Sequence, residues 1–396
     1  MTIFNSLGSN YDINFVLKTL VATNKNSSRQ NLKIFLENKY QGKVFLFYKG
    51  REALEVALKI LNLPKNSKIG INGFTCFAVY EAVKKAGHQV SYLDIDQESL
   101  NFSSGSLIKN IKKEKIKAVI VQNTLGFPCE IEKIKKICQE NDIFLIEDLA
   151  HSIGAKYSNG TEAGTIGDFT VLSFCQDKMI DAVSGGAMII RNKNYQKNNI
   201  DKLQKNKFRQ ELKDRFYPLF TFKIRKTYSL KIGKVLHFLL KKFDLLSKPM
   251  DSSGKLIDLS SWHCNLILNE FNNLEKILKH RRKISNIYKN NIDKNLLSEE
   301  IIKNIHLSSN LRFPIFAKNR ENLISYLRQK SIYLSDIWYD APIAPKKYLN
   351  LTDYKNQCPN SEEISSRIVN LPTHINISEK DALCISKEVN KWLKLQ

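Results

Sequence analysis

The stretch SFCQDKMIDAVSGGAMII, residues 173–190, decides the fold because it sets a lysine between a strand-like run and a paired-glycine turn. The residues FTVLSF (169–174), with which it overlaps, are apolar, aromatic or β-branched and predict a buried strand. A solvated lysine would more naturally fall on one of the many polar helix faces of this chain. The position of Lys178 therefore needs a specific explanation.

From residue 43 onward, strand-like and helix-like segments alternate. Segments with apolar residues three and four positions apart predict helices at 51–61, 78–87 and 130–141. Short β-branched or aromatic runs predict strands at 68–72, 89–95, 117–122, 143–147 and 169–174. This order predicts an α/β fold with a mainly parallel central sheet and helices on both faces. Ligands of such sheets bind beyond the carboxyl ends of the strands.

Four polar residues stand at or just after these strand ends and are candidate ligand-binding residues. Asp148 follows the fourth strand, His151 comes one turn later, and Ser173 and Lys178 end or follow the fifth. Each residue alone keeps an ordinary alternative: a helix N-cap for Asp148, a structural role for His151, and a solvated amine for Lys178. The paired glycines after Lys178 can likewise simply shape a turn.

Gly50 and Arg51 stand at the predicted N-terminus of the helix 51–61. Unpaired backbone N–H groups and the positive end of the helix dipole favour a phosphate there, and glycine permits its close approach. A single ligand could use this phosphate site together with a carboxylate and a lysine at the ends of neighbouring strands. Pyridoxal phosphate requires a phosphate anchor, a carboxylate for its ring nitrogen, and a primary amine for its aldehyde. Arginine cannot replace Lys178, because only an amine that loses its proton forms that bond.

The length and composition of the chain limit the classes of protein to which it can belong. The 396 residues suffice for two domains, and no apolar run approaches the length of about 20 that spans a bilayer. The N-terminus does not resemble a signal peptide, and the seven cysteines include no C-x-x-C pair, so we expect a cytoplasmic protein without disulfides or a metal centre. The net charge of +23 is spread along the chain, which argues against nucleic-acid binding.

The stretch FLIEDLAHSIGAKYSNGTEAGTIGDFTVLSFCQDK (144–178), with SGGAMII after it, resembles the DegT/DnrJ/StrS family of PLP-dependent sugar aminotransferases. GREALEVALKIL, INGFTCFAVYEAVKKAGHQVSYLDID and CPNSEEISSRIVNLPTHINISEKD extend the resemblance. It implies the type I PLP-dependent transferase (aspartate aminotransferase) fold, with a smaller C-terminal α/β domain. The expected organisation is an N-terminal segment (1–42), a large PLP-binding domain (43–270) and a small domain (271–396).

The resemblance also implies roles for individual residues. Lys178 would hold the aldehyde carbon and move the proton, and Asp148 would pair with the pyridine nitrogen. His151 would lie near the cofactor hydroxyl. The phosphate would be bound by a larger set, namely Ser173, Gly50, Arg51 and the backbone at Glu52 and Ala53. We expect no metal ligands.

Two positions depart from the family pattern. Family members place an aromatic residue that stacks on the cofactor ring at the position that holds Cys76 in this chain. We expect Phe74 or Phe77 to stack there instead, with Phe77 preferred. The N-x-R element that the neighbouring subunit contributes to the phosphate site is replaced by SSGKLIDLSSWHCN (252–265). A homodimer is still expected, because the family's sites lie at a subunit interface.

The segment 205–250 has no counterpart in the family's common core. It mixes Lys and Arg with Phe, Tyr and Leu, and IGKVLHFLLKKFDLL (232–246) predicts a helix with one apolar face. Two interpretations stay open: peripheral contact with an anionic membrane at its inner face, or a helical pair covering the active-site mouth or the dimer interface.

The expected function is transfer of an amino group from an amino acid, glutamate first, to a nucleotide-linked keto-sugar in polysaccharide or amino-sugar biosynthesis. Asp177 before Lys178 argues against a cysteine desulfurase, and Lys178 itself argues against the family's dehydratases, which have histidine there. A non-catalytic or regulatory protein associated with a membrane or partner is the alternative. The sequence does not identify the sugar, and the aromatics of DIWYDAPIAP (336–345) suit either a sugar or the core.

Overall fold

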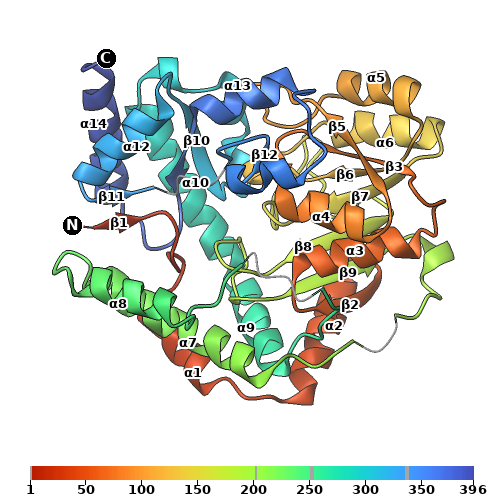
Figure 1. Cartoon of the computed structure of the whole chain (residues 1–396), viewed down its shortest axis with the longest axis horizontal. Coiled ribbons are helices and arrows are strands. Elements are labelled where there is room, and N and C mark those ends of the chain that lie inside the picture. Colours follow the sequence, from red (N-terminus) through yellow and green to blue (C-terminus); the bar gives the residue numbers. More distant parts are fainter. Residues whose placement is uncertain (1, 201–202, 250–253, 335–338) are drawn as a thin grey trace.

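The computed structural model describes residues 2–200, 203–249, 254–334 and 339–396. A seven-stranded sheet in the order β2-β9-β8-β7-β6-β3-β5 forms its centre (Figure 1). Its strands are β2 (Lys43–Phe47), β3 (Lys68–Asn72), β5 (Gln89–Leu93), β6 (Ile116–Val121), β7 (Phe144–Asp148), β8 (Phe169–Ser173) and β9 (Gly186–Ile190). The neighbours from β8 to β5 pair in parallel, whereas β9 is antiparallel to both β2 and β8. The predicted fold class is confirmed.

Helices cover both faces of the sheet because its strands are apolar on both sides. In β6, Ala118 and Ile120 face one apolar cluster, while Val119 and Val121 face another. The first cluster contains α3 (Gly50–Ile60) and α4 (Phe77–Lys85). The second contains α2 (Asn26–Tyr40), α5 (Ser104–Glu114), α6 (Ile131–Glu140) and α9 (Ser261–Asn272). Continuous burial of this kind is typical of parallel sheets.

The N-terminal segment is integrated into the rest of the molecule. Strand β1 (Ile3–Phe4) pairs in parallel with β11 (Ile332–Tyr333). Helix α1 (Ile13–Val21) begins after Asp12, whose carboxylate accepts the N–H of Phe15 at 2.7 Å and so caps the helix. Residues from α1 and α2 belong to the main core rather than to a separate unit.

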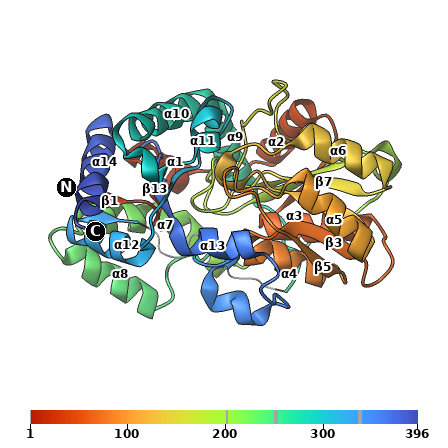
Figure 2. The same cartoon turned by 90° about the horizontal axis from the view of Figure 1, so that it is seen from above.

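The C-terminal third has its own apolar cluster around the antiparallel pair β10 (Arg312–Phe316) and β13 (Ile368–Pro372). Its helices are α10 (Leu274–Asn291), α11 (Glu299–Lys303), α12 (Arg320–Gln329), α13 (Pro359–Arg367) and α14 (Glu379–Leu393). Seen from above, α10, α12 and α14 lie toward the opposite end of the molecule from α5 and α6, whereas α13 lies nearer the middle (Figure 2). Strand β12 (Ile343–Ala344) pairs with β4 (Thr75–Cys76) and so joins this part to the sheet region. The boundary at residue 271 stays a prediction.

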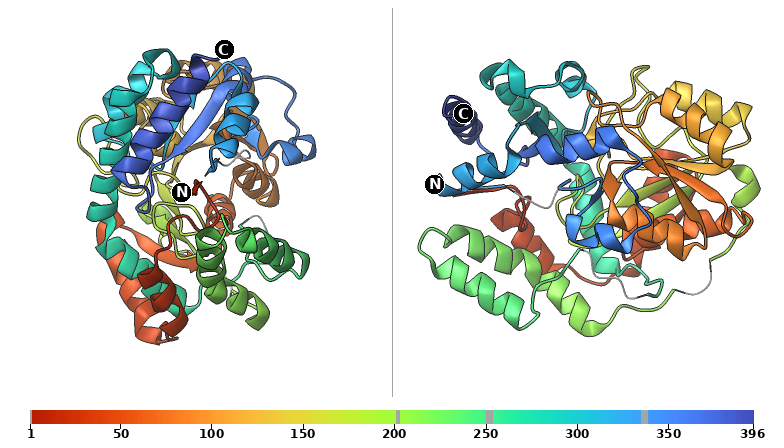
Figure 3. Two further views of the ribbon diagram at one scale, coloured as in Figure 1. Left: turned by 90° about the vertical axis from the view of Figure 1, so that its left-hand side faces the viewer. Right: turned by 45° about the horizontal axis from the view of Figure 1, so that its top comes forward.

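The segment 205–250 forms two helices, α7 (Phe208–Lys226) and α8 (Ile232–Lys242), which we call the α7–α8 hairpin. Figures 1 and 3 show it beside α1, below the C-terminal part. Asp214 of α7 is buried, and accepts hydrogen bonds from Tyr48 at 2.6 Å and Gln210 at 3.1 Å. Among the described residues, no helix is both long and apolar enough to cross a membrane.

Candidate active site

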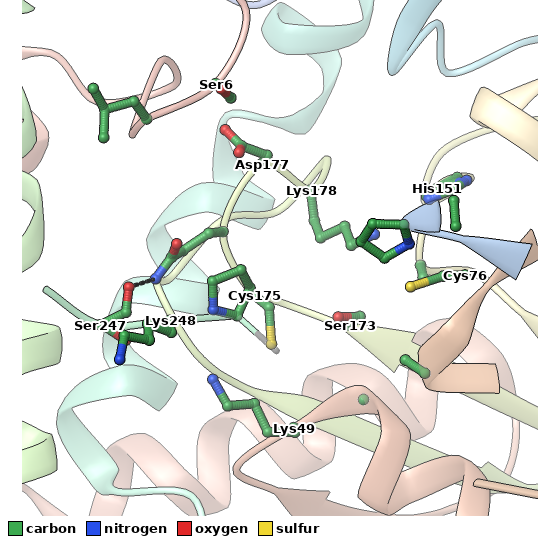
Figure 4. A pocket seen from close by; sticks show the side chains of 18 of the residues that line it. Ser6, Lys49, Cys76, His151, Ser173, Cys175, Asp177, Lys178, Ser247 and Lys248 are labelled. Atoms are coloured by element: carbon green, nitrogen blue, oxygen red, sulfur yellow. Dashed lines mark hydrogen bonds between the residues drawn. The ribbon is translucent and has the colours of Figure 1, made fainter. Parts of the chain in front are cut away.

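A cavity of about 850 Å³ lies at the carboxyl ends of the sheet strands. Figure 4 shows part of its wall, with Lys178 pointing toward His151 and Cys76. Most predicted site residues line this cavity, and they are Gly50, Arg51, Asp148, His151, Ser173 and Lys178. Glu52, Ala53 and Phe77 are not among its lining residues.

Lys178 lies in the loop between β8 and β9. The preceding residue, Asp177, has a left-handed backbone with φ of 62°, and Asn10 donates a hydrogen bond to the Lys178 carbonyl at 3.3 Å. Burial lowers the pKa of the Lys178 amine, against the opposing influence of Cys76 and Asp148. A lowered pKa increases the fraction of neutral amine, which is the nucleophilic form.

Asp148 is the last residue of β7 and is buried. Its Oδ1 accepts the N–H of Ala150 at 2.9 Å, and a turn rather than a helix follows, so it is not a helix N-cap. Burial raises the pKa of this carboxyl, while the Ala150 hydrogen bond and the charge of Lys178 act in the opposite direction. The Asp148 carboxylate is therefore poorly solvated, and a cation placed beside it would interact with it strongly.

His151 is buried in the cavity wall. Its Nδ1 accepts the backbone N–H of Leu125 at 3.3 Å and lies 3.3 Å from Tyr339 Oη. Burial lowers its pKa well below the usual value, and the charges of Lys178 and Arg312 add to this effect. A neutral ring that accepts at Nδ1 carries its proton on Nε2. His151 thus combines a structural hydrogen bond with a place in the cavity.

Ser173 and Gly50 meet at the end of β8. A Cβ on Gly50 would lie 2.8 Å from Ser173 Cβ, so only glycine lets the N-terminus of α3 approach this serine. Ser173 is 7% exposed, and its hydroxyl makes no hydrogen bond to the residues that the structure describes. This end of the cavity offers an uncommitted hydroxyl beside a helix N-terminus, which suits a phosphate.

The other predicted phosphate contacts are engaged elsewhere. Arg51 Nη1 forms an ion pair with Glu81 at 2.7 Å, although the residue lines the cavity. The backbone N–H groups of Glu52 and Ala53 donate to the Lys49 carbonyl at 3.2 and 3.3 Å. Their use as phosphate donors has no support in this geometry, because α3 already consumes both groups.

The predicted aromatic stacking residue is also displaced. Phe77 packs on Tyr348, with ring centroids 5.0 Å apart, and Phe74 stacks on Tyr339 at 4.4 Å. Neither lines the cavity, whereas Cys76 does. Residue Phe77 is the first of α4, and its side chain faces the segment around Tyr348. The position of Phe77 therefore does not support a stacking role.

Sequence reasoning missed several cavity residues. Lys49 is a buried residue of the cavity wall. In the sequence, its position directly before Gly50 was the one feature that could have indicated this. Tyr339 comes from the segment 336–345, of which 336–338 lie outside the described residues. It packs on the core residue Phe74 and also lines the cavity, and its contact with a sugar stays a prediction. The α7–α8 hairpin and the residues after it contribute His237, Leu240, Lys241, Asp244, Leu246, Ser247, Lys248 and Pro249.

The residues present fit pyridoxal phosphate. Gly50 leaves the space that a Cβ would fill next to the uncommitted Ser173 hydroxyl, and the same cavity holds the buried Asp148 carboxyl and the Lys178 amine. Within the described ranges, no group of three or more His, Cys, Asp or Glu side chains is arranged to hold a metal ion.

Several known proteins are similar to this chain in sequence or in fold. GDP-perosamine synthase of Escherichia coli O157:H7 is 24% identical over 92% of this chain and 91% of its own length. A DegT DnrJ EryC1 StrS aminotransferase from Brucella abortus covers 96% of this chain and 95% of its own, with a TM-score of 0.71 and 20% identity. The PLP form of a putative sugar aminotransferase, Spr1654 from Streptococcus pneumoniae, covers 96% of each chain, with a TM-score of 0.68 and 18% identity.

The family profile described as the DegT/DnrJ/EryC1/StrS aminotransferase family matches residues 41–390. This match extends over the sheet, the Lys178 loop and almost all of the C-terminal part, as the resemblance of residues 144–178 indicated. The chain belongs to the DegT/DnrJ/EryC1/StrS aminotransferase family.

Proposed function

We propose that this aminotransferase uses pyridoxal phosphate to move an amino group from glutamate to a nucleotide-linked keto-sugar. The observation that carries the proposal is the convergence of Lys178, Asp148 and Ser173 in one cavity at the strand ends. These three groups supply an amine, a carboxylate and a phosphate-binding hydroxyl, which together match the needs of that cofactor.

When bound, the cofactor supplies an electron sink for cleavage of the bond between the donor's α-carbon and its proton. Lys178 would accept that proton, and its lowered pKa favours this role because a neutral amine is a base. Asp148 would hold a proton on the ring nitrogen from its buried position. His151, neutral and fixed through Leu125, would donate from Nε2 to an oxygen in the cavity.

The outer part of the cavity supports a large anionic acceptor. Lys241 and Arg328 contribute positive charge, and Tyr228 and Tyr333 contribute aromatic surface with ring centroids 5.0 Å apart. Guanidinium and ammonium groups suit a diphosphate, and aromatic rings suit a nucleobase. The relative named GDP-perosamine synthase supports the same substrate class for this chain.

The test is an absorption spectrum of the purified protein before and after glutamate, followed by a panel of nucleotide-linked and free keto-sugars. We expect a cofactor band that glutamate shifts toward the pyridoxamine form and that a nucleotide-linked keto-sugar restores. The Lys178→Ala variant should bind the cofactor without a covalent link. Bound cofactor with no response to any amino donor would instead favour a regulatory protein.

Assembly as a homodimer belongs to the proposal, on the basis of the family's interface-located sites. Light scattering coupled to size-exclusion chromatography would give twice the 45.7 kDa chain mass for a dimer. A monomer that turns over substrate would refute this part alone.

We further propose that the outer face of α8 contacts an anionic membrane. Ile232, Val235 and Phe238 are 59–64% exposed at helical spacing, and Lys231, Lys234 and Lys242 are exposed beside them. Such a basic amphipathic face suits the headgroup layer. Sedimentation with phosphatidylserine vesicles at low salt should be lost in Val235→Ser/Phe238→Ser. The control Leu383→Ser, at an exposed site on α14, should leave it unchanged.

A further inference from the structure

Lys49 is a buried lysine whose position the family resemblance does not explain. It directly precedes Gly50, the first residue of α3, and it is 4% exposed. It lines the cavity, and Figure 4 shows its side chain on the same side as Ser247 and Lys248. A lysine is rarely buried to this degree unless a charged or polar group compensates it.

Within the described chain, Lys49 makes no direct ion pair, although the carboxylates of Asp214 and Glu52 interact with it at longer range. Its ammonium lies 3.3 Å from Ser184 Oγ and 4.7 Å from the centre of the Tyr48 ring. No Asp or Glu oxygen of the described residues lies within 4.0 Å of it. A hydroxyl and an aromatic face solvate an ammonium only partly, so the Lys49 ammonium favours an anion in direct contact with it.

Both carboxylates that interact electrostatically with Lys49 are already engaged: Glu52 Oε2 accepts the Ile257 N–H at 3.3 Å, and Asp214 has three partners. Asp214 Oδ2 accepts from Tyr48 at 2.6 Å and contacts His263 Nε2 at 3.2 Å, and its Oδ1 accepts from Gln210. Neither Asp214 nor Glu52 lines the cavity, whereas Lys49 does. An anion in direct contact with Lys49 therefore has to enter from the cavity.

Two side-chain donors, Ser173 and Lys49, and the positive end of the α3 dipole border the same cavity. Ser173, a residue that is 7% exposed, contributes a hydroxyl that bonds to no described residue, and the close contact of Gly50 with Ser173 places the N-terminus of α3 beside it. Lys49 is covalently joined to that N-terminus. A hydroxyl, the positive end of a helix dipole and an ammonium together suit a phosphate monoester dianion.

We propose that Lys49 is the cation that binds the phosphate of the cofactor, in place of the Arg51 that sequence reasoning selected. Arg51 is held by Glu81 at 2.7 Å and by the Pro249 carbonyl at 3.2 Å. Lys49 belongs to the same chain as Lys178, so the positive charge at the phosphate does not depend on a second subunit. This inference rests on the proposed use of pyridoxal phosphate.

The experiment compares binding of pyridoxal phosphate and of pyridoxal, which lacks the phosphate, by equilibrium dialysis. Lys49→Met should weaken pyridoxal phosphate binding about 10- to 100-fold, the effect of losing a charge-assisted hydrogen bond, and leave pyridoxal binding unchanged. Unchanged pyridoxal binding also shows that the variant is folded. Lys59→Met, on the exposed side of α3 where Lys59 pairs with Glu55, is the matched control and should bind both as wild type does.

Other outcomes would overturn the inference in distinct ways. Equal loss of both ligands would mean that Lys49 is structural. Unchanged cofactor binding with a raised KM for the acceptor would assign Lys49 to the acceptor's phosphates. A phosphate-specific loss in Arg51→Met but not in Lys49→Met would restore the original assignment. Failure of the wild-type protein to bind pyridoxal phosphate at all would refute the proposed function itself.

Discussion

Arg312 Nη2, at the start of β10, lies 3.9 Å from Asp177 Oδ1, in the residue directly before Lys178. Arg312 is fully buried and also donates to the Asn5 carbonyl at 2.6 Å. Burial raises the pKa of Asp177, and Arg312 is the first of several cations that oppose the rise. The C-terminal part and the N-terminal segment thus both anchor the loop that carries the lysine.

Arg312→Met should lower the free energy of unfolding by about 3 kcal/mol, because it leaves the largely buried carboxyl of Asp177 without its main cation. The folded-state pKa of Asp177 is already raised, so its charge disfavours folding as pH rises above about 4. The loss should therefore be larger at pH 8 than at pH 5 in urea titrations. Arg209→Met, at a largely exposed side chain of α7, should cost less than about 1 kcal/mol at either pH.

Asp148→Asn should reduce kcat/KM about 100-fold or more, since it removes the charge that keeps the ring nitrogen protonated. The pKa of the Lys178 amine should fall further, because Asp148 raises it in the native protein. Reductive labelling of Lys178 in the cofactor-free protein, followed over pH, measures that change. Asp142→Asn, at an exposed turn, serves as the control. An unchanged labelling profile would contradict the assigned charge interaction.

Gly50→Ala should lower the free energy of unfolding by about 1–3 kcal/mol and remove most of the protein's affinity for the cofactor. The reason is that the added Cβ would lie 2.8 Å from Ser173 Cβ. Gly105→Ala, in the first turn of α5, is the matched substitution, because the added Cβ would be near only Ser103 Oγ, at 3.7 Å. It should be neutral or stabilising by up to about 1 kcal/mol. Thermal unfolding and cofactor titration of both variants give the comparison.

Asp214→Asn should remove a pH-dependent part of the stability. Burial alone would raise the pKa of Asp214, but the hydrogen bond and charge of His263 and the charge of Lys49 lower it to about 2. A folded pKa below the unfolded value stabilises the protein above about pH 4, by about 2 kcal/mol, and this stability is lost as pH falls toward 2. Denaturation of the variant should show a shallower acid limb, while Glu140→Gln, at an exposed site, should behave as wild type.

The sequence predicted five of the seven strands of the central sheet and the position of Lys178 after one of them, because strand periodicity and short-range spacing are local properties. It predicted neither β2 nor β9. Predicted strands such as 68–72 match the observed bounds, and others such as 143–147 differ by one residue. The packing of Phe77 and the burial of Lys49 were not predicted, because both depend on contacts with distant parts of the chain. Phe77 contacts Tyr348, 271 positions away, and the burial of Lys49 depends on elements that no local pattern specifies.

The reversed direction of β9 has a consequence for how the lysine is placed during folding. Ser173 ends β8 opposite Gly186, which begins β9, so Lys178 lies inside a hairpin whose two strands share one hydrogen-bond ladder. A hairpin closes a short loop and has low contact order, whereas the other strands of the sheet need long crossovers to meet. The turn that presents the lysine can therefore form early, before the distant chain segments that later enclose it arrive.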